Sequence, residues 1–257
     1  MRDFYERYYD AMTHSRAHAA FCERVFGRNL CQHGFADMLQ LDALIEAARL
    51  DPGQAALDLG CGNGMIAEYI SDRTGAHVTG LDYIPAAIRH AQARTAAKAD
   101  RLTFVVGDIN ALDLEDGAYD AIISIDTMYF SNDTTATIGQ LMRALRPGGQ
   151  MAILFSHGRE PWVPVEEFPA ETLPPDKTPL AVALQANGLI FETRDFTDDE
   201  YRLALLRKQV LTELKPQFEA EEIMFIYENR MGDANGISQA VEMGLQRRYL
   251  YLARRPE

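Results

Sequence analysis

The chain has little cysteine and no long apolar run. Its 257 residues include three cysteines, Cys22, Cys31 and Cys61, without a C-x-x-C pair. This pattern favours reduced thiols in a cytoplasmic protein over a disulfide framework or a zinc site. No apolar run approaches the roughly 20 residues that a membrane-spanning helix needs, and the charged, aromatic residues 1–7 do not resemble a signal peptide. We therefore expect a cytoplasmic protein with no membrane partner.

Positive charge is also scarce. The sequence has 25 lysines and arginines against 38 aspartates and glutamates, a formal net charge of −13. Such a chain repels a phosphate backbone, and the pairs Arg247-Arg248 and Arg254-Arg255 are too short to form a basic surface. We expect a neutral or cationic small molecule as partner and no nucleic acid. No H-x-x-H pattern or carboxylate cluster with metal-ligand spacing occurs, so we expect no metal.

Strands and helices are predicted to alternate in the middle of the chain. Apolar runs predict strands at 55–59, 77–81, 102–106, 121–125 and 151–155, and helical patterns predict helices at 65–72, 85–98 and about 134–145. This alternation is typical of a parallel sheet with helices on both faces.

The regions on either side of this alternation have a different character. Residues 1–50 are predicted to form a helical lid, with a third helix at about 35–49, and residues 51–257 the main domain, with a variable substrate-cap region at about 156–246. Six of the eleven prolines fall within 156–180, which predicts an irregular excursion. Further on, the pattern predicts helices at 180–186, 198–214 (capped by Thr197 or Asp198), 218–230 and 237–246, and strands at 189–196 and 248–253.

A glycine-rich turn follows the first predicted strand. Gly60, Gly62 and Gly64 occupy alternate positions, and a helical pattern begins at Met65. Glycine permits positive φ and the close approach of a bound molecule, and a helix N-terminus favours an anionic group. The spacing G-x-G-x-G differs from the dinucleotide fingerprint G-x-G-x-x-G, which disfavours a nicotinamide dehydrogenase.

Acidic residues end the next two strands. Asp82 ends the strand that follows the glycine turn and its helix, where a carboxylate can accept hydrogen bonds from ribose hydroxyls. Asp108 ends the third strand and could accept from an adenine amino group, while the Ile109 N–H could meet a ring nitrogen. Tyr83 could flank the adenine ring.

These features, with Leu57-Asp58-Leu59 before the glycines and the turn at 146–149, resemble the class I S-adenosylmethionine-dependent methyltransferases over about residues 54–155. The resemblance implies a doubly wound α/β fold with a seven-stranded, mostly parallel sheet, an antiparallel last strand and helices on both faces. It also implies bound S-adenosylmethionine, with S-adenosylhomocysteine as product. The implied cofactor-binding residues are Asp58, Gly60, Cys61, Gly62, Gly64, Asp82, Tyr83, Asp108, Ile109 and Asp126.

The candidate catalytic residues lie after the fourth strand and in the predicted lid. Asp126 could orient or deprotonate the acceptor, contact the cofactor's ammonium group or cap a helix. A base is needed only if the nucleophile arrives protonated. The other catalytic candidates are His14, His18, Tyr129 and His157. Further residues that could form or simply pack the pocket are Tyr5, Tyr8, Tyr9, His33, Glu160, Trp162, Tyr201 and Tyr227.

The resemblance indicates transfer of a methyl group to a small molecule, at nitrogen first, with oxygen and carbon acceptors open. Such a displacement depends mainly on positioning the reacting atoms in line. The chain lacks the [DN]-P-P-[YF] signature of enzymes that methylate amino groups of nucleic acids and protein glutamine. Two alternatives stay open: an aminopropyl transferase that uses the decarboxylated cofactor, and a non-catalytic cofactor-binding module. The acceptor and a possible homodimer are not decided by the sequence.

Overall fold

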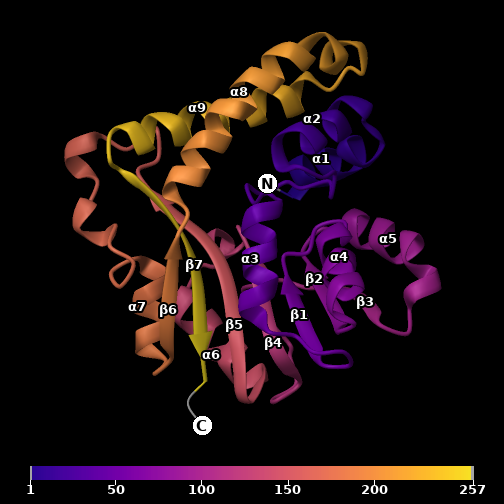
Figure 1. The fold of residues 1–257 in the computed structure, drawn as a ribbon, viewed down its shortest axis with the longest axis vertical. Helices are drawn as coiled ribbons and strands as arrows, with labels where there is room; N and C mark the ends of the chain where they lie inside the picture. Colours follow the sequence, from indigo (N-terminus) through magenta and orange to yellow (C-terminus); the bar gives the residue numbers. More distant parts are fainter. Residues whose placement is uncertain (1, 256–257) are drawn as a thin grey trace.

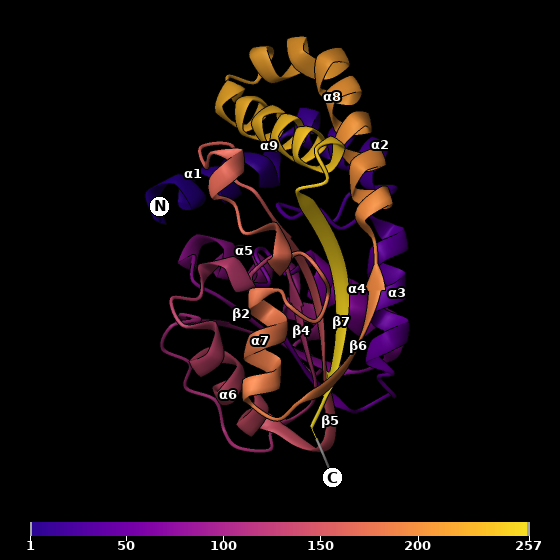
Figure 2. The same ribbon diagram turned by 90° about the vertical axis from the view of Figure 1, so that its left-hand side faces the viewer.

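The computed structural model describes residues 2–255 and contains one seven-stranded sheet (Figures 1 and 2). The strand order is β3-β2-β1-β4-β5-β7-β6. The strands β1 to β5 run parallel, and β7 is antiparallel to both β5 and β6. The strands are β1 (Ala55–Leu59), β2 (His77–Asp82), β3 (Leu102–Val106), β4 (Tyr119–Ile125), β5 (Leu145–Gly158), β6 (Ile190–Asp195) and β7 (Gln246–Arg254).

Helices cover both faces of the sheet. Apolar side chains of α3, α4 and α5 form a core with one face, and those of α6 and α7 form a core with the other. These helices are α3 (Met38–Ala48), α4 (Met65–Thr74), α5 (Pro85–Arg94), α6 (Thr134–Ala144) and α7 (Pro179–Ala186), with short 3₁₀ turns at Ala96–Lys98, Met128–Phe130, Val165–Glu167 and Ala170–Thr172. The predicted doubly wound fold with an antiparallel last strand is therefore confirmed.

A helical cap lies over the carboxyl ends of the parallel strands (Figure 1). It consists of α1 (Arg2–His14), α2 (Arg16–Phe26), α8 (Thr197–Ala220) and α9 (Met224–Glu242). A third apolar cluster, which includes Phe21 of α2, Leu211 of α8 and Ile226 of α9, holds these helices together. The predicted lid at 1–50 is thus divided: α1 and α2 belong to the cap, whereas α3, expected in the same lid, packs on the sheet.

Three local predictions differ from the structure. The predicted turn at 146–149 is a bulge inside β5, because Leu145 pairs with Tyr119 and Gln150 with Ala121. The predicted cap of α8 is wrong: Phe196 is the N-cap, and the Asp195 carboxylate accepts from the Thr197 N–H at 2.8 Å.

The helix predicted at 218–230 is also wrong, because the chain breaks between α8 and α9 at Glu221–Ile223, where Glu222 has a φ of +57°. The helix α8 instead continues through Pro216, and α9 runs without interruption past Gly232 and Gly236. Burial of apolar side chains between the two helices outweighs these local helix-breaking signals.

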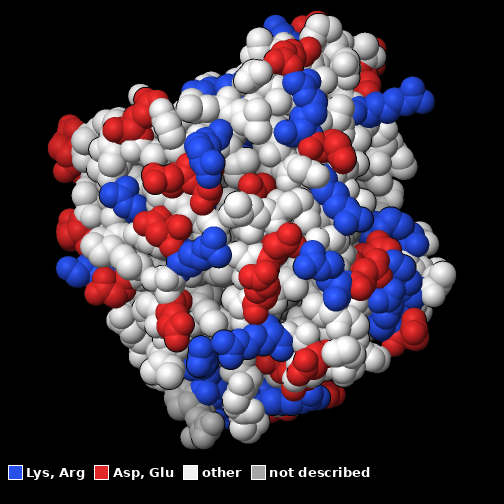
Figure 3. Space-filling view, in the orientation of Figure 1, with Lys and Arg blue, Asp and Glu red and all other residues white. Residues whose placement is uncertain are grey.

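Acidic and basic side chains are intermixed on the face of the molecule that Figure 3 shows. No continuous basic area covers that face. Within residues 2–255, no helix combines the length and the apolar character needed to cross a membrane.

Candidate active site

A cavity of about 400 Å³ lies where β1, β2, β3 and β4 end. Parallel strands present their carboxyl ends at one edge of a sheet, which is where ligands bind in folds of this class. The loops after these strands form the floor, and α1 together with the loop between α2 and α3 forms the opposite wall. The cavity is therefore enclosed by the sheet on one side and by N-terminal residues on the other.

The glycine turn after β1 forms part of the floor. Gly60 and Cys61 donate their N–H groups to the Leu81 carbonyl at 2.7 and 3.1 Å, which ties the turn to β2. Gly60 has a φ of +81°, and a Cβ there would overlap the side chain of Thr127. A Cβ on Gly62 would lie 2.9 Å from the Tyr9 hydroxyl. Both glycines thus allow neighbouring walls of the cavity to approach the turn.

Gly64 does not line the cavity. It has a φ of +74°, and a Cβ there would lie 2.7 Å from Phe104 Cζ of β3 and 2.9 Å from Ala91 Cβ of α5. Its place in the motif is explained by close packing where α4 begins. Its predicted contact with a cofactor stays a prediction.

Two acidic side chains are buried in the floor. Asp82 accepts hydrogen bonds from the N–H groups of Gly62 (2.8 Å) and Ile84 (2.9 Å). Asp58, at the end of β1, has one carboxylate oxygen that is buried and has no hydrogen-bond partner among the described residues. Burial, together with the charge of Asp82, raises the pKa of Asp58 to about 7. An unpartnered buried carboxylate is costly unless a ligand supplies a donor.

The loop after β3 supplies a third acidic side chain to the cavity. Asp108 is half-buried and accepts from the Asn110 N–H at 2.8 Å, and Ile109 beside it is buried. Tyr83 after β2 is exposed on one side, and the Arg2 guanidinium lies 5.2 Å from the centre of its ring.

The structure therefore brings nine of the ten predicted cofactor-binding residues to one cavity. They are Asp58, Gly60, Cys61, Gly62, Asp82, Tyr83, Asp108, Ile109 and Asp126.

Asp126 is held in a buried ion pair. Its two carboxylate oxygens accept from the Arg248 guanidinium at 2.7 and 3.1 Å, and one also accepts from the Phe35 N–H at 2.7 Å. Burial opposes its charge, but Arg248 outweighs burial and keeps the pKa of Asp126 below its usual range. The backbone of Asp126 also has a positive φ, which is unusual for a residue with a side chain. It is therefore a weak base whose hydrogen-bonding capacity is largely used.

Tyr129 lies outside the cavity lining but beside Asp126. Its hydroxyl donates to Asp126 at 3.2 Å and accepts from the Ser156 N–H at 2.6 Å. Burial of the hydroxyl, then the charge of Asp126, raises the pKa of Tyr129 well above its usual value. The geometry makes Tyr129 a support for Asp126.

The structure does not bring the three predicted catalytic histidines to the cavity. His14 is exposed on α1, and His157 contacts the Thr172 hydroxyl at 2.7 Å. His18 is fully buried in the cap, where its Nε2 lies 3.2 Å from an Arg230 nitrogen. Burial and Arg230 lower the pKa of His18 well below its usual value. The positions of these three histidines, away from the cavity, do not support a catalytic role.

His33 is the cavity histidine that the catalytic candidates omitted. It lies in the loop between α2 and α3, and its Nε2 is buried without a partner among the described residues. Its ring lies edge-on to the rings of Tyr5 and Tyr8, at 5.1 and 4.8 Å between centres. Arg230 fixes the loop by donating to the carbonyls of Gln32 and His33. Burial, then Arg230, lowers the pKa of His33 to about 3, so the imidazole is neutral.

The aromatic wall opposite the floor was anticipated in part. Tyr5 and Tyr9, which the sequence placed among possible pocket residues, line the cavity with Phe130. Thr127, Asn63 and Asn110 line it too and carried no recognised signal. Thr127 could not be found from the sequence, because its side chain lies beside Gly60 only once β1 and β4 are neighbours in the sheet.

Known proteins share both the sequence pattern and this architecture. Residues 56–149 match a family model described as a methyltransferase domain. Phosphoethanolamine N-methyltransferase 1 of Arabidopsis thaliana is 29% identical over 164 residues, 64% of this chain and 33% of that protein. Demethylmenaquinone methyltransferase of Beutenbergia cavernae is 28% identical over 166 residues, 65% of each chain. The chain thus spans about a third of the length of the plant relative.

Solved structures show the same fold. Phosphoethanolamine N-methyltransferase 2 of Haemonchus contortus, in complex with phosphomonomethylethanolamine and S-adenosylhomocysteine, has a TM-score of 0.71 at 21% identity, covering 100% of this chain and 60% of that one. A mycolic acid cyclopropane synthase has a TM-score of 0.73 at 18% identity, covering 96% and 97%. Residues 56–149 of the chain therefore match the methyltransferase-domain model, and the chain has the class I, Rossmann-like methyltransferase fold.

Proposed function

We propose that this protein transfers a methyl group from S-adenosylmethionine to the nitrogen of a small amine. The observation that carries the proposal is the charge of the cavity. Asp58, Asp82 and Asp108 line its floor, and Arg2 is the one lysine or arginine among its described lining residues. A cavity of this kind attracts cations and repels anions. It therefore suits both a sulfonium cofactor and an ammonium acceptor.

The floor offers suitable partners for each part of the cofactor. The Asp82 carboxylate would accept hydrogen bonds from the ribose, and Asp108 and Ile109 would receive the adenine. Asp58 has a buried oxygen without a partner among the described residues, which fits the cofactor's ammonium group. When bound, S-adenosylmethionine supplies a methyl group already activated by a positive sulfur. The protein then has to bind, orient and exclude water.

The aromatic wall supports an amine as acceptor. Tyr5, Tyr9 and Phe130 face the same cavity as the acidic floor, and aromatic rings stabilise alkylammonium groups. The neutral His33 has an Nε2, unpartnered within the described chain, that could accept a hydrogen bond from the acceptor's N–H. With a pKa of about 3 it is too weak a base to remove a proton from an ammonium ion. We therefore assign His33 to orientation of the acceptor.

Names of related proteins are in keeping with this proposal. Phosphoethanolamine N-methyltransferases occur among the curated relatives and the solved structures, and the latter also include a putative sarcosine dimethylglycine methyltransferase from Galdieria sulphuraria. Their acceptors are small amines by name. The acidic net charge supports the expectation that nucleic acid is not a substrate. The three cysteines are buried and form no disulfide, which fits the expected cytoplasmic location. The homodimer remains a prediction.

Calorimetry with S-adenosylmethionine tests the cofactor site. We expect the intact chain to bind one equivalent, and Asp82→Ala to weaken binding by about tenfold or more, because several hydrogen bonds to one charged group are lost. The far-UV spectrum should not change. Binding that is equal in both proteins would remove Asp82 from the site.

Mass spectrometry with a panel of small amines tests the transfer. A product heavier by one methyl group supports the proposal, and an aminopropyl gain from the decarboxylated cofactor would replace it with the alternative reaction. His33→Ala should raise KM for the amine with little effect on cofactor affinity, and His77→Ala at the opposite end of β2 is the control. Cofactor binding without turnover of any amine would contradict the proposed reaction but leave the cofactor site standing.

A further inference from the structure

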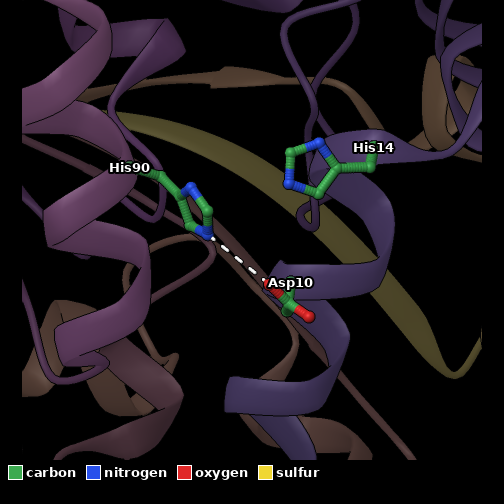
Figure 4. A group of neighbouring side chains, drawn as sticks. All are labelled: Asp10, His14 and His90. Carbon is green, nitrogen blue, oxygen red and sulfur yellow. Dashed lines mark ion pairs between the residues drawn. The ribbon is translucent and has the colours of Figure 1, made fainter.

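Asp10, His14 and His90 form a cluster outside the cavity, which we call the α1–α5 cluster. Asp10 and His14 lie one turn apart on α1, and His90 faces them from α5 (Figure 4). One potential ligand atom from each residue lies within 4.8 Å of those of the other two, and His90 Nε2 is 3.7 Å from Asp10 Oδ1. Two imidazoles and one carboxylate thus meet at the joint between the cap and the sheet domain.

This donor set suits a divalent transition metal ion. Zinc binds imidazole nitrogen and carboxylate oxygen at about 2.0–2.2 Å in a tetrahedron, which places the ligand atoms roughly 3.4 Å apart. The His90 Nε2 to Asp10 Oδ1 distance of 3.7 Å is close to this value, and the other two separations are within 4.8 Å. Asp10 and His14 are exposed, so rotation of their side chains can close the remaining gap. Oxygen-only ions such as Mg²⁺ and Ca²⁺ are disfavoured by the two imidazoles.

The surroundings leave room for the rest of a coordination shell. Asp10 and His14 line an open hollow with Ser15 and Glu221. The Glu221 carboxylate is already used, because it accepts from the Ser15 hydroxyl at 2.6 Å and the Ala17 N–H at 3.0 Å. Water can therefore supply the fourth ligand without competition from Glu221.

An ion bound at the α1–α5 cluster would connect two parts of the cavity. The helix α1 supplies Arg2, Tyr5 and Tyr9 to the cavity wall, and α5 begins shortly after Asp82 in the cavity floor. A metal ion bound by ligands from both helices would join wall and floor.

We propose that Asp10, His14 and His90 bind one Zn²⁺-type ion that latches α1 onto α5 and holds the cavity closed. The sequence pattern predicted no metal, because Asp10 and His14 alone do not make a metal motif and His90 lies far along the chain from both. The latch is independent of the proposed reaction, since it concerns the movement of α1 whatever the cavity binds.

Titration of the untagged protein with Zn²⁺ tests the site. We expect one ion to bind, and His14→Gln and His90→Gln each to weaken binding by more than about tenfold, since losing even a residue that supports a ligand costs about 10–100-fold. His77→Gln, at an exposed histidine on β2, should bind as the unaltered protein does. No binding at millimolar Zn²⁺, or equal binding in His90→Gln, would overturn the site.

Amide hydrogen exchange tests the latch separately from catalysis. Zn²⁺ should slow exchange in α1 of the unaltered protein and have no such effect in His90→Gln. Zinc binding that leaves exchange in α1 unchanged would overturn the latch. The measurement needs neither S-adenosylmethionine nor an acceptor, so its failure is distinct from failure of the proposed function.

Discussion

At the scale of single residues, Asp58 is a cavity side chain whose pKa folding raises strongly. It is fully buried and its neighbour Asp82 is also acidic, so burial and repulsion act in the same direction and raise its pKa to about 7. A carboxyl group whose pKa is raised by folding stabilises the protein below its unfolded pKa of about 4, and this contribution is lost as the pH rises through about 7. The ligand-free protein should therefore become less stable between pH 5 and pH 8.

Replacing Asp58 by asparagine should remove this loss. We expect the free energy of unfolding of Asp58→Asn, relative to the unaltered protein, to rise by about 2–3 kcal/mol between pH 5 and pH 8. Urea denaturation at the two pH values measures the difference, and Asp113→Asn at an exposed position is the control. A difference between Asp58→Asn and the unaltered protein that does not change with pH would show that Asp58 ionises normally.

The residue scale also shows which residues the sequence could assign to the cavity. Asp82 and Asp108, which line the cavity, were identified because a carboxylate at the end of a parallel strand faces a cleft, whatever else surrounds it. His33 could not be ranked above His14 or His18 from the sequence. Which histidine reaches the cavity depends on how α1, α2 and α9 pack, and helical spacing carries no information about that.

At the scale of elements, the glycine turn shows that one motif serves two purposes. Gly60 and Gly62 line the cavity, whereas Gly64 allows α4 to start against Phe104 of β3. Gly64→Ala should destabilise the protein by about 2–5 kcal/mol, the sum of a positive φ and an overpacked contact. Gly53→Ala measures the cost of the positive φ alone, because Gly53 has a φ of +82° and no atom lies within 4 Å of an added Cβ.

Equilibrium denaturation of both variants separates the two effects. Gly53→Ala should cost only about 1–2 kcal/mol. If Gly64→Ala cost no more than Gly53→Ala, then Phe104 and Ala91 would have room to move, and the close packing of α4 would not explain this glycine.

At the scale of the whole molecule, the buried Arg248 connects elements that are far apart in the sequence. From β7 it pairs with Asp126 after β4, and it donates to Gln40 of α3 at 2.6 Å and to Ser156 of β5 at 2.8 Å. Glu200 of α8 lies 3.7 Å away. Asp126 also holds the Phe35 N–H, so the loop that carries His33 is fixed to the sheet through this pair.

Asp126→Asn should therefore disturb both stability and the cavity wall. Removing one charge of a buried pair costs about 3–5 kcal/mol, and we expect a loss near the lower end because Glu200 still faces Arg248. The low pKa of Asp126 means that its contribution is present above about pH 4 and is lost only as the pH falls further. Urea denaturation at pH 7 and pH 3 should show a large difference between the two proteins at pH 7 and a smaller one at pH 3.

An exposed ion pair provides the matched control. Glu192 is the surface partner of Arg254 at 3.4 Å, and Glu192→Gln should cost about 0–1 kcal/mol. If Asp126→Asn cost as little, the buried pair would not hold the wall. We also expect Asp126→Asn to lower turnover more than cofactor affinity, through displacement of the His33 loop.

The sequence by itself determined the sheet, the glycine turn and the acidic strand ends of this protein. Those features depend on local periodicity and on a rule that every parallel strand obeys, and both are present in short stretches of sequence. Only the tertiary structure decided that α3 leaves the lid, that α8 continues through Pro216, that His33 faces the cavity and that Arg248 pairs with Asp126. These outcomes follow from packing between segments far apart in the chain, where burial and charge pairing outweigh local preference.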